Sequence, residues 1–183
     1  WSPSGGNAAA ATNLSAGNYM CVVTDAQGCT ASVMETITEP SPLIITPANI
    51  IHVSCHGDNN GSVTIVVNGG TPAYSYLWTP SNQISQTANN LSAGNYNCLV
   101  TDINGCQQSQ VFVISEPAQL ILTASPSITI CYGLGTTLNA IPSGGTLPYN
   151  YLWSTGSTTS SIIPNTTVTS IYTVTVTDNN NCV

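Results

Sequence analysis

A block of about 77 residues recurs along this chain, and this repeat restricts the fold more than any other feature. The string Asn13–Tyr19 returns unchanged as Asn90–Tyr96, and Glu39-Pro40 returns as Glu116-Pro117. A third, looser copy preserves mainly a Gly-Gly-Thr turn and a Tyr-x-Tyr-x-Trp segment. Self-similarity at a fixed period is typical of tandem arrays, in which each repeat is one structural unit.

The repeat divides the chain into three modules. Trp1 aligns with Trp78, so the chain opens partway through a module, and it closes where the central copy still has one strand to run. We therefore expect the C-terminal part of one module, a complete module, and a module that lacks its last strand, at residues 1–40, 41–117 and 118–183. There is no initial Met, signal peptide or membrane-spanning stretch, and we interpret the sequence as a section of a longer polypeptide.

The charge composition excludes several classes of partner. The chain has no Lys and no Arg, and seven Asp and Glu residues give it a net charge of -7. Such a surface cannot neutralise phosphates, so we expect no nucleic-acid partner and no attraction to anionic lipid head groups. We also expect no direct insertion into a membrane. Val, Ile and Thr are abundant, which favours strands over disorder.

Short alternating segments in the central module predict strands. Ser62–Asn68 alternates Val63, Ile65 and Val67, and Asn95–Thr101 alternates in the same way. About seven short strands separated by turn signals predict an all-β fold of tandem immunoglobulin-like β-sandwich modules. The strands expected in the central module are residues 50–54, 62–68, 74–78, 83–85, 88–91, 95–101 and 106–115.

Two aromatic positions should anchor the sandwich cores. We expect Trp78 and Trp153 to occupy matching buried positions between two sheets, near Tyr96 and Tyr172. A large indole on a central strand should dominate so small a core. Tyr96 follows Ala-Gly at the start of its strand, as the tyrosine of a tyrosine corner does.

Seven cysteines in a chain of small modules indicate an oxidising compartment. Cys55 and Cys106 are 51 residues apart, and so are Cys131 and Cys182. Because two modules repeat one separation, the spacing predicts one disulfide in each module, Cys55–Cys106 and Cys131–Cys182.

Three cysteines remain outside these pairs. Cys29 would pair with a cysteine that precedes Trp1. We interpret Cys21 and Cys98 as small buried apolar residues, because Val174 stands at the matching position of the third module.

The shared residues resemble a known family. A cysteine followed by Asn-Gly-Ser, Gly-Gly-Thr-Pro-x-Tyr-x-Tyr-x-Trp, Leu-Ser-Ala-Gly-x-Tyr, Thr-Asp-x-x-Gly-Cys and Glu-Pro is similar to the SprB-type repeat of very large secreted surface proteins of Bacteroidota, including a gliding adhesin. The third module looks more like the Ig/PKD-like modules that accompany those repeats. The resemblance implies an extracellular, type IX-secreted protein of filamentous or adhesive kind, and it implies no catalytic residues.

One cluster has the residue types of a metal site or of a Cys/His nucleophile: His52, Cys55, His56 and Asp58. The third module has Ile, Tyr and Leu at the three positions other than the cysteine, so we interpret the cluster as a disulfide cysteine flanked by strand-end histidines. Asp58–Gly61 is rich in oxygen ligands, but a turn explains it without calcium. We expect no metal, no cofactor and no enzymatic activity.

Four Asn-x-Ser/Thr sequons are candidate glycosylation sites: Asn13, Asn60, Asn90 and Asn165. Two interpretations stay open. Asn suits the turns in which these residues lie, whereas a surface with so few charges would need another source of hydration, which covalent glycans would supply.

Two functions compete. The first is a structural segment of an extracellular bacterial fibre or surface stalk, whose partners are neighbouring modules or copies of itself and whose incomplete module is completed by chain continuation or by a neighbour's strand. The second is an adhesin module that binds glycans or another cell surface. Its candidate aromatic residues are Tyr74, Tyr76, Tyr149 and Tyr151, although their alternation also suits a core.

Overall fold

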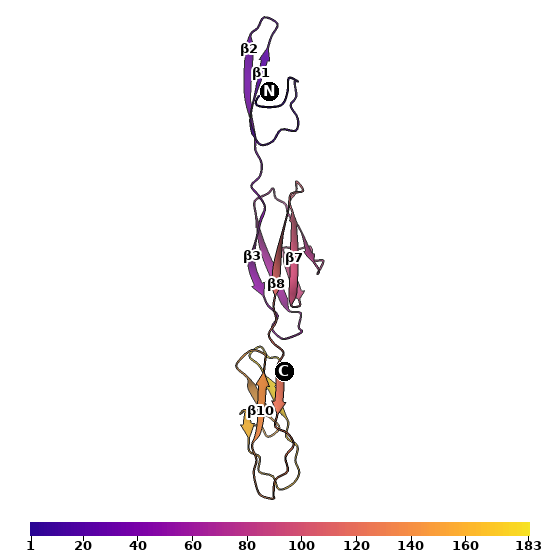
Figure 1. Cartoon of the computed structure of the whole chain (residues 1–183), viewed down its shortest axis with the longest axis vertical. Coiled ribbons are helices and arrows are strands. Elements are labelled where there is room, and N and C mark those ends of the chain that lie inside the picture. Colours follow the sequence, from indigo (N-terminus) through magenta and orange to yellow (C-terminus); the bar gives the residue numbers. More distant parts are fainter.

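A computed structural model describes all residues from 1 to 183, and it shows three bodies arranged end to end along one axis (Figure 1). The chain forms thirteen β-strands and no α-helix, which confirms the predicted all-β fold. The structure contains no helix that could cross a membrane.

The central module is a sandwich of two three-stranded antiparallel sheets. One sheet has the order β3-β4-β6 and the other the order β5-β7-β8. The strand bounds are β3 (Ile44–Ile51), β4 (Gly61–Asn68), β5 (Ser75–Thr79), β6 (Thr87–Leu91), β7 (Gly94–Thr101) and β8 (Gln107–Ile114).

Six strands form in this module, and two details differ from the sequence prediction. The first strand begins at Ile44, six residues before the predicted start, and its register shifts between Pro47 and Asn49. Residues 83–85 form no strand, because the N–H of Trp78 donates to the carbonyl of Gln83 and closes a turn there. The Ig-like sandwich is otherwise as predicted.

The core of the central module lies between its two sheets. Trp78 on β5 is fully buried, with its ring 5.6 Å from that of Phe112 on β8, and its Nε1–H donates to the carbonyl of Ser85. Tyr96 is also buried, and its hydroxyl donates to the carbonyl of Ser92 over 3.1 Å. The buried indole and the predicted tyrosine corner are therefore confirmed.

The first module contains a hairpin of β1 (Gly17–Thr24) and β2 (Thr30–Ile37), with the same register as β7 and β8. Tyr19 repeats the tyrosine corner by donating to the carbonyl of Ser15. No sheet faces this hairpin: Val23 is 64% exposed, whereas its counterpart Val100 is 0% exposed. The hairpin thus corresponds to two of the three strands of one sheet, β7 and β8.

The third module places a sheet of order β12-β10-β9 against the pair β11-β13. Its strands are β9 (Ile121–Ala124), β10 (Leu138–Ser143), β11 (Asn150–Trp153), β12 (Ser161–Ile162) and β13 (Val174–Thr177). Trp153 is buried at 4% exposure, and Tyr172 packs against the same core, as predicted.

An apolar groove opens between the two sheets of the third module. Leu122 and Leu138 line one side, and Trp153, Tyr172 and Val174 line the other. No strand lies beside β13 at the position that β8 takes beside β7 in the central module. The groove therefore lies at the edge of the core, on the side where β8 packs in the central module.

Candidate functional site

The most elaborate polar structure in the chain lies where the central and third modules meet, and its first component is the Gly-Gly turn. At this junction Gly144 and Gly145 have φ values of 72° and 60°, in the left-handed region that favours glycine, and Gly69 and Gly70 form the same turn where the first and central modules meet. The N–H of Gly70 donates to the carbonyl of Ser41 in the linker, over 2.6 Å. Gly145 makes the same contact with Ala118 over 2.8 Å. The Gly-Gly turn thus fastens each linker to the module that follows it.

An aspartate holds the second component, the loop that carries Cys182. Oδ1 of Asp178 accepts from the N–H groups of Asn180 and Cys182 over 2.8 and 2.9 Å, and Oδ2 accepts from the N–H of Thr146 over 2.7 Å. Burial alone would raise the pKa of Asp178, but the backbone N–H groups of Cys182, Thr146 and Asn180 outweigh it and hold the pKa below its usual range. The ionised carboxylate therefore fixes the cysteine relative to the Gly-Gly-Thr turn.

The same loop occurs in the other two modules. The N–H of Cys106 donates to Oδ1 of Asp102 over 2.8 Å, and the N–H of Cys29 donates to Oδ1 of Asp25 over 2.8 Å. The N–H of Thr71 is the main cause that lowers the pKa of Asp102. The Asp-x-x-x-Cys spacing occurs three times in the sequence, and in each module the aspartate forms the turn that carries the cysteine.

The third component is the loop that carries Cys55, at the opposite end of its module. The carbonyl of Cys55 accepts from the N–H of Asp58 over 3.1 Å, in a turn where Gly57 has a φ of 81°. The N–H of Gly57 donates to Oε2 of Glu116 over 2.6 Å, and His56 Nδ1 lies 3.1 Å from Oε1 of the same carboxylate. The Glu-Pro linker therefore holds the loop of Cys55 in place.

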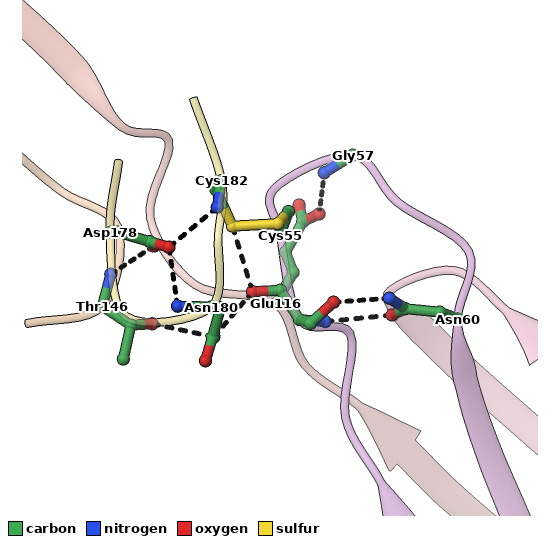
Figure 2. Close-up of a disulfide and its surroundings, with 9 residues drawn as sticks. Cys55, Gly57, Asn60, Glu116, Thr146, Asp178, Asn180 and Cys182 are labelled. Atoms are coloured by element: carbon green, nitrogen blue, oxygen red, sulfur yellow. Dashed lines mark hydrogen bonds between the residues drawn. A yellow bond between two sulfur atoms is a disulfide. The ribbon is translucent and has the colours of Figure 1, made fainter. Parts of the chain in front are cut away.

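A disulfide joins Cys55 of the central module to Cys182 of the third module, with the Cα atoms 5.7 Å apart (Figure 2). The two cysteines are 127 residues apart in sequence. The predicted intramodular pairs Cys55–Cys106 and Cys131–Cys182 are therefore wrong. The bond instead links two consecutive modules.

The geometry of the sandwich explains why an intramodular bond cannot form. The N–H of Val53 donates to the carbonyl of Ser115, so Cys55 lies near the end of β8, whereas Cys106 directly precedes its start. The nine residue steps from Cys106 to Ser115 place the two ends about 30 Å apart. A disulfide requires Cα atoms only about 4.4–6.8 Å apart. Cys55 and Cys106 therefore face different neighbours.

Further contacts surround the bond (Figure 2). The side-chain amide of Asn180 donates to the carbonyl of Ser54 across the junction over 2.8 Å, and to Oγ1 of Thr146 over 3.1 Å. Oδ1 of Asn60 accepts from the N–H of Ser54 over 3.0 Å. The C-terminal end of the chain lies at this junction and not at the far end of the third module (Figure 1).

Residues 49–83 match the family model of the SprB repeat. The match includes the Cys55 loop, β4, the Gly-Gly turn and the buried Trp78. It confirms the SprB-type resemblance for this part of the central module, and it associates the chain with cell-surface proteins. None of the curated proteins matches the chain.

Outside the bonded pair, the cysteines of the chain differ in exposure. Cys29, Cys106 and Cys131 are unpaired and exposed, and Cys21 is half-buried. Cys98 of the central module is fully buried and unpaired, and burial raises its thiol pKa to about 11. The prediction of a small buried residue is therefore confirmed for Cys98.

The histidine cluster serves the loop structure of the SprB repeat. His52 Nδ1 accepts from the N–H of Ser115 over 3.1 Å, His56 contacts Glu116, and Cys55 is in the disulfide. No group of three His, Cys, Asp or Glu side chains gathers as metal ligands do.

The four tyrosines considered for adhesion belong to the cores of their own modules. The hydroxyls of Tyr74 and Tyr149 donate to the carbonyls of Gly69 and Gly144, over 2.6 and 2.5 Å. All four pack against the core clusters, including Tyr76 on β5 and Tyr151 on β11.

The sequon asparagines are all exposed, but they differ in their bonding. Asn13 and Asn90 occupy equivalent turns with φ values of 58° and 54°. The side-chain amide of Asn60 is engaged with Ser54 through both its oxygen and its nitrogen. The three candidates with freer side chains are Asn13, Asn90 and Asn165.

Proposed function

We propose that this chain is a structural segment of an extracellular bacterial fibre or surface stalk made of tandem Ig-like repeats, with no catalytic role. The observation that carries the proposal is the disulfide between Cys55 and Cys182. A covalent bond between two consecutive modules serves the length and stiffness of an array.

The junction has two covalent connections, and this supports a stiff rod. Relative motion is the default for domains joined by one linker. Here the Glu116-Pro117 linker and the Cys55–Cys182 bond connect the same two bodies, and the amide of Asn180 adds a hydrogen bond. Two separate attachments oppose bending about either one.

The composition supports a location outside the cell. Structural disulfides persist in oxidising compartments. A chain without Lys and Arg has no cleavage site for trypsin-like proteases, which recognise those residues. Neighbouring modules would be its main partners, and glycans on Asn13, Asn90 or Asn165 would hydrate a surface that has few charges.

The adhesin alternative has less support. Its aromatic candidates are engaged in core packing and in hydrogen bonds to the Gly-Gly turns. A role in contact with other cells would then have to reside in other residues.

Immunogold electron microscopy of intact bacteria tests the proposal. Antibodies raised against this chain should decorate filaments or stalks on cells that produce the parent protein, with repeated label along each filament. Pre-immune serum and cells that lack the gene are the controls. Label confined to the cell interior, or scattered on a surface without any extended structure, would refute the proposal.

A further inference from the structure

The parts that form the disulfide at the central–third junction are also present where no bond has formed. The Cys106 loop reproduces the Cys182 loop: the N–H of Asp102 donates to the carbonyl of Cys106 over 3.0 Å, as Asp178 does to Cys182 over 3.0 Å. The N–H of Thr71 donates to Oδ2 of Asp102 over 2.9 Å, in the manner of the third module. Cys106 is therefore presented as Cys182 is, but its thiol is free.

Cys131 likewise reproduces the presentation of Cys55. The carbonyl of Cys131 accepts from the N–H of Leu134 over 3.1 Å, the same turn that Cys55 forms with Asp58. Gly133 has a φ of 76° at the matching position. Cys131 is exposed and unpaired.

The two free thiols lie at opposite ends of the two-module unit. Cys106 lies beside Thr71 and the Gly-Gly turn that holds the linker from the first module. Cys131 lies in the loop between β9 and β10, at the end of the third module that points away from the central module (Figure 1). Each thiol therefore faces the place of the next module along the axis.

We propose that the Cys55–Cys182 bond is one instance of a staple that recurs at each junction of a tandem array. In each staple, the cysteine after the first strand of one module bonds to the cysteine of the Asp-x-x-x-Cys loop in the following module. Cys106 bonds to the cysteine after the first strand of the preceding module, and Cys131 bonds to the Asp-x-x-x-Cys cysteine of the following module. The proposal rests on the array of the proposed function and specifies the chemistry that joins its members.

The partner of each thiol is another module of the same type. The bonded junction supplies a second recognition contact, the hydrogen bond from the Asn180 amide to the carbonyl of Ser54. Asn104 occupies the same position in the central module, where its amide donates to Oγ1 of Thr71 over 2.9 Å. The amide of Asn180 donates both to the threonine of its own module and to the carbonyl of Ser54 in the preceding module. Asn104 makes the first of these contacts, so its amide is placed to donate a hydrogen bond to a preceding module as well.

Each staple forms by oxidation of two thiols. Two protons and two electrons pass to an oxidant of the disulfide class, such as the active-site disulfide of a thiol–disulfide oxidoreductase, which becomes a dithiol. Thiol–disulfide exchange requires access to the attacking sulfur, and both Cys106 and Cys131 are exposed. Cys98 takes no part because it is fully buried.

An extended chain tests the proposal. A second copy of residues 41–117 is inserted directly after Pro117, so that both new boundaries keep the native linker sequences. The insertion adds three cysteines, the copies of Cys55, Cys98 and Cys106. After oxidative refolding with a glutathione redox buffer, thiols are counted in denaturant for the original and the extended chains.

The extended chain should contain only one more thiol than the original, because a new staple consumes two cysteines. Digestion with chymotrypsin should release a peptide pair linked through Cys55 and Cys106, which the original chain must not give because these residues lie at opposite ends of one module. In the matched control, Cys106→Ser in the second copy only, the linked pair should be absent.

Three additional thiols in the extended chain, with no linked pair, would overturn the recurring staple. Failure to fold is distinguished by the Cys55–Cys182 peptide, which reports the native junction in the same digest. Since immunogold labelling of fibres does not depend on this bond, the staple and the proposed function can fail separately.

Discussion

A single carboxylate decides where each junction cysteine lies. Oδ1 of Asp178 receives two backbone N–H groups and Oδ2 receives a third, so an amide in its place would turn a donor toward a donor. We expect Asp178→Asn to lower the midpoint of thermal unfolding by several degrees and to leave a larger fraction of Cys182 as thiol after oxidative refolding. Calorimetry and thiol counting measure both effects. Asp25→Asn, in the exposed loop of the first module, is the matched control and should leave the Cys182 bond intact.

The lowered pKa values of Asp102 and Asp178 predict an acid-sensitive fold. A carboxyl whose pKa is lower in the folded state contributes stability that is fully present above its unfolded pKa, about 3.9, and is lost as the pH falls through the folded value. The free energy of unfolding should therefore decrease below about pH 4. In the double variant Asp102→Asn and Asp178→Asn this decrease should be smaller, as urea unfolding between pH 2 and pH 7 would measure. An unchanged pH slope in the double variant would contradict the assigned role.

Thiol reactivity should separate the cysteines by burial. Because burial raises the pKa of Cys98 to about 11, almost none of this thiol is ionised at pH 8, and no solvent reaches it. N-ethylmaleimide should label Cys106 and Cys131 of the folded chain within minutes and Cys98 only in denaturant. Mass spectrometry of the labelled chain measures this. Rapid labelling of Cys98 under native conditions would show that the sandwich opens.

At the scale of the strand, alternation and turn chemistry were enough to predict most of the central sandwich. Ser62–Asn68 was predicted within one residue of β4, and the face that carries Tyr96, Cys98 and Val100 was correct. The early part of β3 was missed because Pro47 interrupts its pattern, and the structure accommodates this proline with a register shift.

The disulfide pairing could not be predicted from cysteine spacing. In an array of fixed period, equal separations appear whether each cysteine pairs within its own module or with the next one. Cys55 has a candidate at Cys106 in its own module and another at Cys182 in the next. Only the position of each loop at one end of the sandwich or the other decides between them, and that is a property of the folded strands.

A strand added beside β13 should stabilise the third module. Phe112 of β8 covers Trp78 in the central module, whereas the groove beside Trp153 has no such cover. Because Val183 stands at the position of Gln107, appending a copy of Gln108–Pro117 after Val183 keeps the register; it should fill the groove and bury one large apolar side chain, a gain of about 2 kcal/mol in the free energy of unfolding. Urea unfolding and a blue shift of tryptophan emission would measure it. The same extension carrying the equivalent of Phe112→Ala should lose most of the gain, and an equal effect of both extensions would contradict the groove assignment.

At the scale of the whole molecule, the staple changes the path that tension follows. A force applied along the axis enters the central module at its linker, passes along β3 to Cys55, and crosses the disulfide to Cys182. The strands between these two cysteines lie outside this covalent path. The length of the module under tension therefore does not depend on the hydrogen bonds of its sheets. The covalent path through the disulfide sets the maximum extension.

Single-molecule stretching of the chain, held at its two termini, measures this limit. Under oxidising conditions the segment between Cys55 and Cys182 should stay hidden, and reduction of the bond under load should release the 127-residue separation, a gain in contour length of about 450 Å at roughly 3.6 Å per residue. In Cys55→Ser the same length should be released without a reductant, in steps as the modules unfold. Full extension of the oxidised native chain without any reductant would show that tension passes through the sandwich interior. In that case the staple would orient neighbouring modules without carrying the load between them.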